Sequence, residues 1–156
     1  MNFEGQQAPA IELNNQDGKK VTLDDFKGKY VVLYFYPKDD TPGCTTQACD
    51  FRDNLDTFSD LNAVILGVSP DDEKSHNKFI EKFDIPYDLL VDTEKEAAKA
   101  YDVWRLRKMF GKEFMGIERS TFIIDPEGKV VKQWRKVQAK GHFEKVLEQL
   151  RELQNA

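Results

Sequence analysis

The stretch Val31-Val32-Leu33-Tyr34-Phe35-Tyr36 is a continuous run of β-branched and aromatic residues. A run without polar alternation is typical of a strand buried on both faces, as in the middle of a parallel or mixed sheet. Thr41-Pro42 soon afterwards indicates the start of a helix, because Thr can cap a helix and Pro is favoured at its first position. Such strand-to-helix junctions are where α/β sheets gather their chemistry.

The rest of the chain alternates between strand and helix patterns, and Asp17-Gly18 indicates a hairpin turn near the N-terminus. Strands alternating with helices and followed by an antiparallel pair predict an α/β fold with a mixed central sheet and helices on both faces. Residues 102–118 have the least clear pattern, and we assign no element to them. The predicted strands cover residues 10–13, 20–22, 31–36, 63–68, 89–91, 120–124 and 130–137, and the predicted helices cover 42–58, 94–101 and 141–153. A further helix is predicted after the acidic residues 71–73, with Phe79, Ile80 and Phe83 on its apolar face.

The composition describes one acidic globular unit. The 156 residues carry 23 basic and 28 acidic side chains, a net charge of −5, which argues against nucleic acid as a partner. No linker divides the chain, so we expect a single domain over residues 1–156. No apolar run reaches the roughly 18 residues of a membrane span, and residues 1–9 do not have the pattern of a secretory signal. We therefore expect a cytoplasmic protein without a membrane partner.

Cys44 would be the third residue of the helix that Thr41 caps and Pro42 begins. The first turn of a helix has unpaired N–H groups and the positive end of the dipole, which favour thiolate over thiol. Gly43 keeps the approach to the sulfur open. The alternative is a buried, inert cysteine that fills space, a common fate of free cysteines. Position alone leaves both interpretations open.

Cys49 lies five residues after Cys44. On a regular helix this step advances about 7.5 Å and turns about 500°, which separates the Cα atoms by roughly 8 to 9 Å. That separation exceeds the limit of about 7 Å for a disulfide. Either the two cysteines never pair, or the first turns of the helix unwind when they do. Cys49 could also be a simple core residue, and the spacing is not the Cys-x-x-Cys of disulfide exchangers.

The pattern Pro37-x-x-x-Thr41-x-x-Cys44 resembles the active-site signature of peroxiredoxins, which are thiol-dependent peroxidases with a thioredoxin-like fold. The wider segment 35–49, Phe-Tyr-Pro-Lys-Asp-Asp-Thr-Pro-Gly-Cys-Thr-Thr-Gln-Ala-Cys, is similar to the bacterioferritin comigratory protein type, also called the Q type. Residues 119–125, Arg-Ser-Thr-Phe-Ile-Ile-Asp, resemble the arginine strand of that family, and residues 18–28 resemble its N-terminal region. The resemblance covers nearly the whole chain.

The resemblance implies a role for each matched residue. Cys44 would be the peroxidatic nucleophile, which attacks a peroxide and becomes a sulfenic acid. The Thr41 hydroxyl would hydrogen-bond the peroxide, and Arg119 would favour the thiolate and hold the substrate. Backbone N–H groups around Gly43 would add donors, and Pro37 would pack over the sulfur and limit water. Thr41 could instead be only a helix cap, although we expect it to do both, and Pro37 only a strand end. Arg119 could be an ordinary surface arginine paired with Glu118 or Asp125.

The resemblance also implies the rest of the cycle. Cys49 matches the resolving cysteine of those members that carry both cysteines in one helix, so it would form an intramolecular disulfide with Cys44. Thioredoxin or a similar dithiol would reduce that disulfide. The substrates would be hydrogen peroxide and alkyl hydroperoxides, and the protein would be a monomer. We expect no metal and no cofactor.

Two functions compete with peroxidase activity. One is a redox-sensing protein-interaction module, in which oxidation of Cys44 and Cys49 is a signal; the other is a thioredoxin-like domain without chemistry. Outside the motif we expect His76 and His142 on helix surfaces, and Asp39 and Asp40 pointing outward. The basic and apolar segment 105–115 could be a docking loop or a wall of the substrate pocket, but a loop with a packed apolar side is the interpretation we favour.

Overall fold

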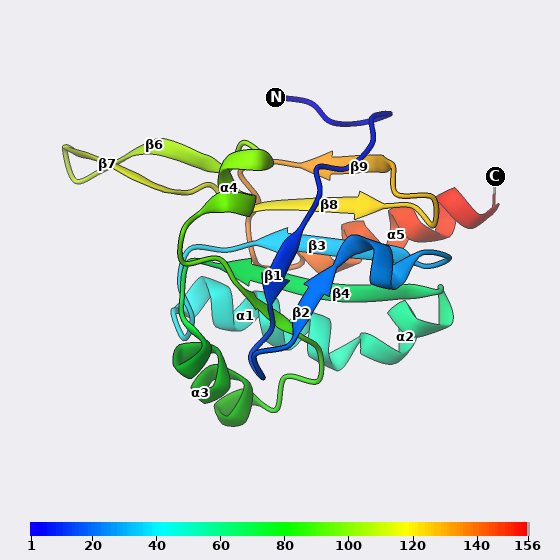
Figure 1. Ribbon diagram of the computed structural model, residues 1–156, viewed down its shortest axis with the longest axis horizontal. Helices are drawn as coiled ribbons and strands as arrows, with labels where there is room; N and C mark the ends of the chain where they lie inside the picture. The colour runs from blue at the N-terminus through cyan, green and yellow to red at the C-terminus, as the bar shows by residue number, and fades with distance from the viewer. Residues whose placement is uncertain (156) are drawn as a thin grey trace.

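The computed structural model describes residues 1–155, and a seven-stranded mixed sheet forms its centre (Figure 1). The order of strands across the sheet is β2-β1-β5-β4-β3-β8-β9. The central strand β3 runs parallel to β4 and antiparallel to β8. These strands are β1 (Glu12–Asn14), β2 (Lys20–Thr22), β3 (Tyr30–Phe35), β4 (Ala63–Ser69), β5 (Leu89–Val91), β8 (Ser120–Ile124) and β9 (Val130–Trp134).

Helices cover both faces of this sheet unequally. Four helices, α1 (Pro42–Asp53), α2 (Leu55–Asp60), α3 (Glu73–Phe83) and α5 (His142–Asn155), contribute to the core on one face. The short helix α4 (Glu96–Ala100), the 3-10 helix η1 (Leu23–Phe26) and the N-terminal segment cover the other face. This arrangement confirms the mixed sheet with helices on both faces that the alternating pattern predicts. No helix among the described residues has the length and apolar character needed to cross a membrane.

The apolar run of β3 fills both cores. Val31, Leu33 and Phe35 point into the core beneath α4, while Val32 and Tyr34 point into the core beneath the four larger helices. All five side chains are nearly inaccessible to solvent. Neither face of β3 can tolerate a polar residue, which explains why the run has no alternation.

The helix predicted for residues 42–58 is interrupted. It ends at Asp53, and α2 begins at Leu55 after Asn54, whose φ of −115° departs from helical geometry. The Asn54 side chain donates a hydrogen bond back to the Asp50 carbonyl, the kind of local bond that competes with the helical ladder. Phe58 nevertheless packs against Phe51, with 5.5 Å between ring centroids. The spacing of apolar residues therefore continues from α1 into α2, and it gives no sign of the break at Asn54.

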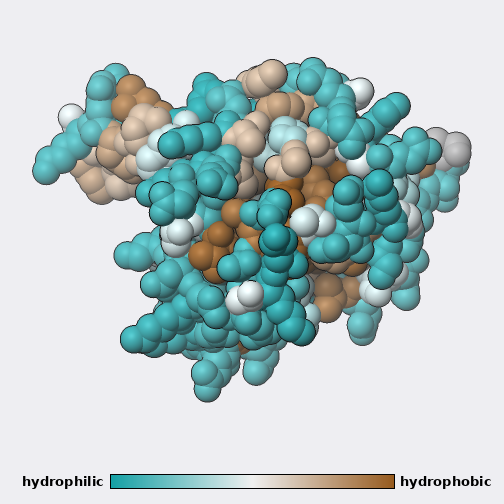
Figure 2. All heavy atoms as spheres, viewed as in Figure 1, coloured by the Kyte–Doolittle hydropathy of each residue, from teal (hydrophilic) through white to brown (hydrophobic). Residues whose placement is uncertain are grey.

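Residues 102–118, where the sequence shows no pattern, form a two-stranded hairpin. Its strands β6 (Trp104–Met109) and β7 (Lys112–Ile117) pair only with each other, and the hairpin projects from the body of the molecule (Figure 1). Figure 2 shows apolar atoms on the surface of this projection. The tip residue Phe110 is 96% exposed, and four further apolar side chains are exposed: Leu106, Met109, Phe114 and Met115. The packed apolar side that we favoured for this segment is therefore wrong for these residues.

Other boundaries shift by a few residues. The last strand ends at Trp134 instead of residue 137, and the helix predicted for residues 94–101 covers Glu96–Ala100. His142, expected on a helix surface, is buried, and its Nε2 lies 2.9 Å from Thr121 Oγ1. Burial, followed by the positive charges of Lys145 and Arg119, lowers the pKa of His142 to about 4. The surface placement of His142 is therefore wrong.

Candidate active site

Cys44 lies in the first turn of α1, just beyond the carboxyl end of β3. Thr41 has the extended backbone of an N-cap residue, with φ −99° and ψ 156°, and Pro42 is the first helical residue. The Cys44 side chain is only 1% exposed and belongs to the core beneath the larger helices. The sulfur is therefore a buried thiol next to the N-terminal end of a helix, as the sequence predicts.

Arg119 reaches this thiol from the neighbouring strand. It immediately precedes β8, and the first residue of β8, Ser120, lies opposite Phe35, the last residue of β3. Since the two strands are antiparallel, the start of one meets the end of the other. The guanidinium Nη2 donates a hydrogen bond to Cys44 Sγ at 3.3 Å. The structure thus joins two residues that lie 75 positions apart in the sequence.

Gly43 makes room for the guanidinium. A Cβ atom at this position would lie 3.1 Å from Arg119 Nη2, closer than most side-chain contacts allow. A residue with a side chain at Gly43 would therefore push Arg119 away from the sulfur. The glycine opens the approach to Cys44 for the arginine of the same chain, an additional reason for its presence in the motif.

Gln47 is a second partner of Arg119, and it was not among the site residues predicted from the sequence. Its Oε1 accepts a hydrogen bond from Arg119 Nη1 at 2.7 Å, and its side chain is 1% exposed. Gln47 lies three residues after Cys44, the spacing that places two side chains on one face of a helix. That spacing is the signal that could have found it. Among residues 1–155, Gln47 Nε2 is a buried side-chain nitrogen without a hydrogen-bond partner.

The Thr41 hydroxyl does not cap α1. It donates a hydrogen bond to the Lys38 carbonyl at 2.8 Å, and no side-chain capping bond forms. Thr41 occupies the N-cap position by its backbone alone, so the interpretation of its side chain as a cap is wrong. Because the hydroxyl proton points to Lys38, the oxygen lone pairs are free to accept a further hydrogen bond.

Pro37 lies at the surface, on the wall of a cleft that also contains Arg119. The cleft has a volume of about 390 Å³. Its other lining residues come from the hairpin strand β6, from the link between β7 and β8, and from the segment after β9: Leu106, Arg107, Lys108, Glu118, Lys136 and Val137. The exposed Pro37 ring borders the entrance to the site, and basic residues surround that entrance.

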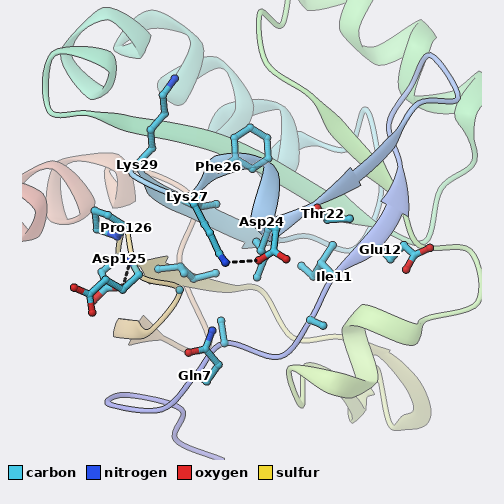
Figure 3. Close-up of a pocket in the computed structure, with 17 residues that line it drawn as sticks. Gln7, Ile11, Glu12, Thr22, Asp24, Phe26, Lys27, Lys29, Asp125 and Pro126 are labelled. Carbon is cyan, nitrogen blue, oxygen red and sulfur yellow. Dashed lines mark hydrogen bonds and ion pairs between the residues drawn. The ribbon is translucent and has the colours of Figure 1, made fainter.

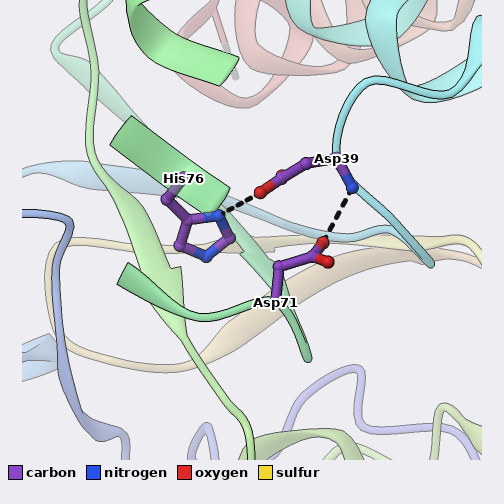
Figure 4. Close-up of side chains that lie close together, drawn as sticks. All are labelled: Asp39, Asp71 and His76. Atoms are coloured by element: carbon purple, nitrogen blue, oxygen red, sulfur yellow. Dashed lines mark hydrogen bonds and ion pairs between the residues drawn. The ribbon is translucent and has the colours of Figure 1, made fainter. Parts of the chain in front are cut away.

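Asp39 and His76, both expected at the surface, are buried together. Asp39 is 7% exposed and His76 is completely buried, with 2.7 Å between Asp39 Oδ2 and His76 Nδ1 (Figure 4). The outward orientation predicted for Asp39 is therefore wrong. Asp40 does point outward and pairs with Lys82, and Lys38 is exposed. The buried carboxylate of Asp39 faces α3.

Cys49 is partly exposed on the same helix as Cys44, and neither cysteine is bonded to another. Burial is the largest cause that raises the pKa of the Cys49 thiol; Arg52 opposes the shift, and the charges of Asp53 and Asp50 add to it. Both cysteines lie within the continuous helix α1. The geometric argument from spacing therefore applies, and a bond between them requires α1 to unwind locally.

A second cleft, of about 350 Å³, lies away from these residues (Figure 3). It is lined by the N-terminal segment, η1 and the turn between β8 and β9, including Gln7, Phe26 and Pro126. Neither cysteine lines it. Arg119, which contacts Cys44, lines the cleft of about 390 Å³ and not this one.

Residues 4–133 match the model of the AhpC/TSA family. This chain belongs to the AhpC/TSA family. It is 58% identical over 149 residues to Peroxiredoxin Bcp of Bacillus subtilis, which covers 96% of this chain and 95% of that protein. The structure of the Xanthomonas campestris bacterioferritin comigratory protein, described for its alkyl peroxide reduction activity, superimposes with a TM-score of 0.86 at 44% identity over 90% of each chain. A Xylella fastidiosa PrxQ mutant gives a TM-score of 0.87 at 37% identity over 94% of this chain and 95% of that one.

The resemblance to Q-type peroxiredoxins and the thioredoxin-like fold are thereby confirmed. The chain is an oxidoreductase of the peroxidase class, which implies a peroxide substrate and a thiol reductant. In this peroxiredoxin the motif residues Cys44, Arg119 and Gly43 lie together, and Thr41 is at the N-cap of the helix that carries Cys44. The motif did not reveal Gln47 or the buried pair of Asp39 and His76.

Proposed function

We propose that Cys44 is the peroxidatic cysteine of this enzyme and that Arg119 and Thr41 bind the peroxide beside it. The observation that carries the proposal is the 3.3 Å contact between Arg119 Nη2 and Cys44 Sγ, which places a fixed cation on a buried sulfur. A guanidinium is a permanent cation with several donors in a fixed geometry, so it can hold a peroxide oxygen next to the sulfur. The basic residues around the cleft would attract the partly negative oxygens of a hydroperoxide.

In the first step the Cys44 thiolate attacks the terminal oxygen of the hydroperoxide. An S–O bond forms and the O–O bond breaks, so sulfur is oxidised to a sulfenic acid and the peroxide is reduced. The leaving alkoxide or hydroxide takes a proton and departs as alcohol or water. Donors already aimed at the reacting oxygens stabilise the developing negative charge, a role that fits Arg119 and the backbone N–H groups of the first helical turn around Gly43.

In the second step we propose that Cys49 resolves the sulfenic acid. Its thiol attacks the oxidised sulfur of Cys44, a disulfide forms and water leaves. Because α1 holds the two residues five positions apart on a regular helix, its first turns must unwind before the sulfurs can meet. Cys49 is already partly exposed, so Cys44 is the residue that has to leave its buried position.

A dithiol then reduces the disulfide, and we propose thioredoxin as that reductant. We also propose that the whole chain acts as one domain and as a monomer, since an internal disulfide needs no second subunit. Both cysteines must return to thiols in every cycle, which favours the cytoplasm as the site of action. The acidic net charge supports a protein that binds no nucleic acid, and we propose no membrane partner.

The test is to add one equivalent of hydrogen peroxide to the reduced protein and to map its peptides by mass spectrometry without reducing agent. We expect a disulfide between Cys44 and Cys49. A stable sulfenic acid at Cys44 with reduced Cys49 would refute the resolving role and would favour a one-cysteine enzyme or a sensor. An unoxidised Cys44 would refute the peroxidatic assignment.

Three variants separate the roles in a coupled assay with thioredoxin. Cys44→Ser should abolish peroxide consumption. Cys49→Ser should still form the sulfenic acid but should lose turnover supported by thioredoxin. Arg119→Ala should slow the first step, and an unchanged second-order rate constant with peroxide would remove Arg119 from the site.

A further inference from the structure

The peptide group between Lys38 and Asp39 is held at both of its polar atoms. Its carbonyl, on Lys38, accepts the hydrogen bond from the Thr41 hydroxyl at 2.8 Å. Its N–H, on Asp39, donates to Asp71 Oδ2 at 2.7 Å (Figure 4). Because the two atoms belong to one planar unit, fixing the N–H also fixes the direction of the carbonyl. Asp71 therefore acts on the Thr41 hydroxyl through a single peptide plane.

The Asp71 carboxylate is itself anchored at the end of β4. Its Oδ2 accepts a second hydrogen bond from Ser69 Oγ at 2.7 Å, and Ser69 is 1% exposed. The position of the Lys38–Asp39 peptide is thereby tied to the rigid central sheet.

The Asp39 side chain is anchored independently. Its Oδ1 accepts from the Tyr36 hydroxyl at 2.6 Å, and its Oδ2 accepts from Ser75 Oγ at 2.8 Å and lies 2.7 Å from His76 Nδ1. His76 Nε2 lies 2.8 Å from the Leu90 carbonyl, which can only accept. The charged imidazole satisfies both contacts, since it donates from both nitrogens.

Charge and burial agree with this arrangement. Burial is the largest influence on His76 and opposes its charge, but the hydrogen bond and the charge of Asp39, with the Leu90 carbonyl, outweigh it and raise the pKa of the imidazole. Asp39, Asp71 and His76 lie close enough for a metal site. However, both His76 nitrogens already face acceptors of the protein, so the cluster is better described as an internal ion pair with its hydrogen bonds.

We propose that Asp71, supported by the buried pair of Asp39 and His76, is a positioning residue that aims the Thr41 hydroxyl at the peroxide. This inference rests on the proposed function, in which Thr41 contacts the substrate. With its proton directed to the Lys38 carbonyl, the Thr41 oxygen presents lone pairs and can accept the O–H of a hydroperoxide. Without Asp71, the peptide plane can rotate and the hydroxyl loses its fixed direction.

The loop needs such support because its backbone is not relaxed. Asp40, between the peptide and Thr41, has a φ of 57°, in the left-handed region that residues other than glycine seldom adopt. Such a conformation persists when surrounding contacts hold it. The hydrogen bonds of Asp39 and Asp71 supply those contacts on one side of Asp40, and helix α1 supplies them on the other.

The experiment compares Asp71→Ala with Asp71→Asn, both in a Cys49→Ser background so that Cys44 is the only thiol. We expect Asp71→Ala to lower the second-order rate constant with hydrogen peroxide about tenfold, within the range that a misplaced group can cost. Asp71→Asn should restore most of the rate, because its amide oxygen accepts from the same N–H. Alkylation of Cys44 by iodoacetamide needs the thiolate but no hydrogen bond to a peroxide, so it should keep its rate in both variants.

Asp72→Ala is the matched control. Asp72 is the neighbouring carboxylate, and it caps α3 by accepting a hydrogen bond from the Ser75 N–H. Its loss therefore weakens the N-terminal end of α3, the helix that carries Ser75 and His76. We expect normal peroxide reactivity from Asp72→Ala. If Asp71→Ala does not fold, Asp39→Asn provides the second test, because it keeps the volume but removes the ion pair, and it should slow peroxide attack without slowing alkylation.

Combination with Thr41→Val separates this inference from the proposed function. If Thr41→Val reacts at the normal rate, the assignment of Thr41 to the substrate fails, and the positioning role fails with it. If Thr41→Val is slow, Asp71→Ala should have no further effect in that background. A full additional loss there, a normal rate for Asp71→Ala alone, or an equal loss of alkylation would overturn the positioning role while leaving the peroxidase assignment intact.

Discussion

Replacing Gln47 with leucine should misalign Arg119 while leaving the fold in place. Gln47 Oε1 and Cys44 Sγ accept from different nitrogens of the same guanidinium, at 2.7 Å and 3.3 Å. Leucine has a similar volume but accepts no hydrogen bond. The guanidinium of the variant therefore keeps the sulfur as a partner but loses the contact that fixes its rotation.

The size of the effect follows from the strength of that contact. A hydrogen bond to a charged group contributes about 1.5 to 3 kcal/mol. If the whole amount serves alignment, the second-order rate constant with peroxide should fall about tenfold at the lower figure and about a hundredfold at the upper.

Stability should change much less than activity. Gln47 Nε2 is buried without a partner among the described residues, and an unsatisfied buried donor costs about 1 to 3 kcal/mol. Leucine removes this cost at the same time as it removes the bond to Arg119. The two effects oppose each other, so the free energy of unfolding of the Gln47→Leu variant should stay within about 1 kcal/mol of the original.

The assay is stopped-flow mixing of reduced protein with hydrogen peroxide, with urea unfolding in parallel. Thr46→Leu, at an exposed position on the same helix, is the control and should react normally. In an Arg119→Ala background the effect of Gln47→Leu should vanish, because there is no guanidinium left to align. A normal rate for Gln47→Leu, or an undiminished effect in the Arg119→Ala background, would refute the reasoning.

Three further predictions concern stability. Folding favours the neutral form of His142, because burial lowers its pKa from 6.5 to about 4. Lowering the pH from 6.5 to about 4 should therefore remove up to about 3 kcal/mol from the free energy of unfolding. Gly67→Ala should destabilise the protein by about 1 to 3 kcal/mol, because a Cβ there would lie 2.8 Å from Leu89 and 2.9 Å from Tyr34. Phe110→Ser should change the free energy of unfolding by no more than about 0.5 kcal/mol, because the ring is 96% exposed.

Urea unfolding curves check all three. For His142, the comparison is between the original and His142→Asn at pH 7 and pH 4.5. The variant should lose less stability between these values, and an equal loss would contradict the assignment to His142. A Gly67→Ala protein of normal stability would show that the core accommodates the methyl group. A large loss from Phe110→Ser would mean that the hairpin tip packs against the body of the protein.

The central fold could be predicted because β3, β4 and β8 are apolar runs that end at recognisable turn or helix-start residues. The register of β3 against β8 could not be, since it depends on partners far apart in the chain. The hairpin of β6 and β7 escaped notice for a different reason. Neither of its faces is buried against the core over most of its length. The apolar alternation of a half-buried strand is therefore missing from its sequence, and basic, acidic and apolar residues are mixed.

The site was predictable only in the part that the motif covers. Cys44 and Arg119 came from the family pattern, and the spacing of residues alone left a reactive cysteine and an inert one equally open. The sequence predicts an outward Asp39 because a carboxylate close to the sulfur would oppose its ionisation, and a surface His76 because no matched motif lies near it. Each is buried because the other is present, and a pair separated by 37 positions leaves no local signal in one sequence.

The distance in sequence between Cys44 and Arg119 also determines when the sulfur acquires its cation. A ribosome adding about 5 to 20 residues per second needs several seconds or more to synthesise the 75 positions between them. Throughout that interval the growing chain carries Cys44 without the guanidinium and without the strand that delivers it. Under the proposed mechanism, the incomplete polypeptide therefore lacks the guanidinium that assists the attack of Cys44 on peroxide, and gains it only once β8 has docked beside β3.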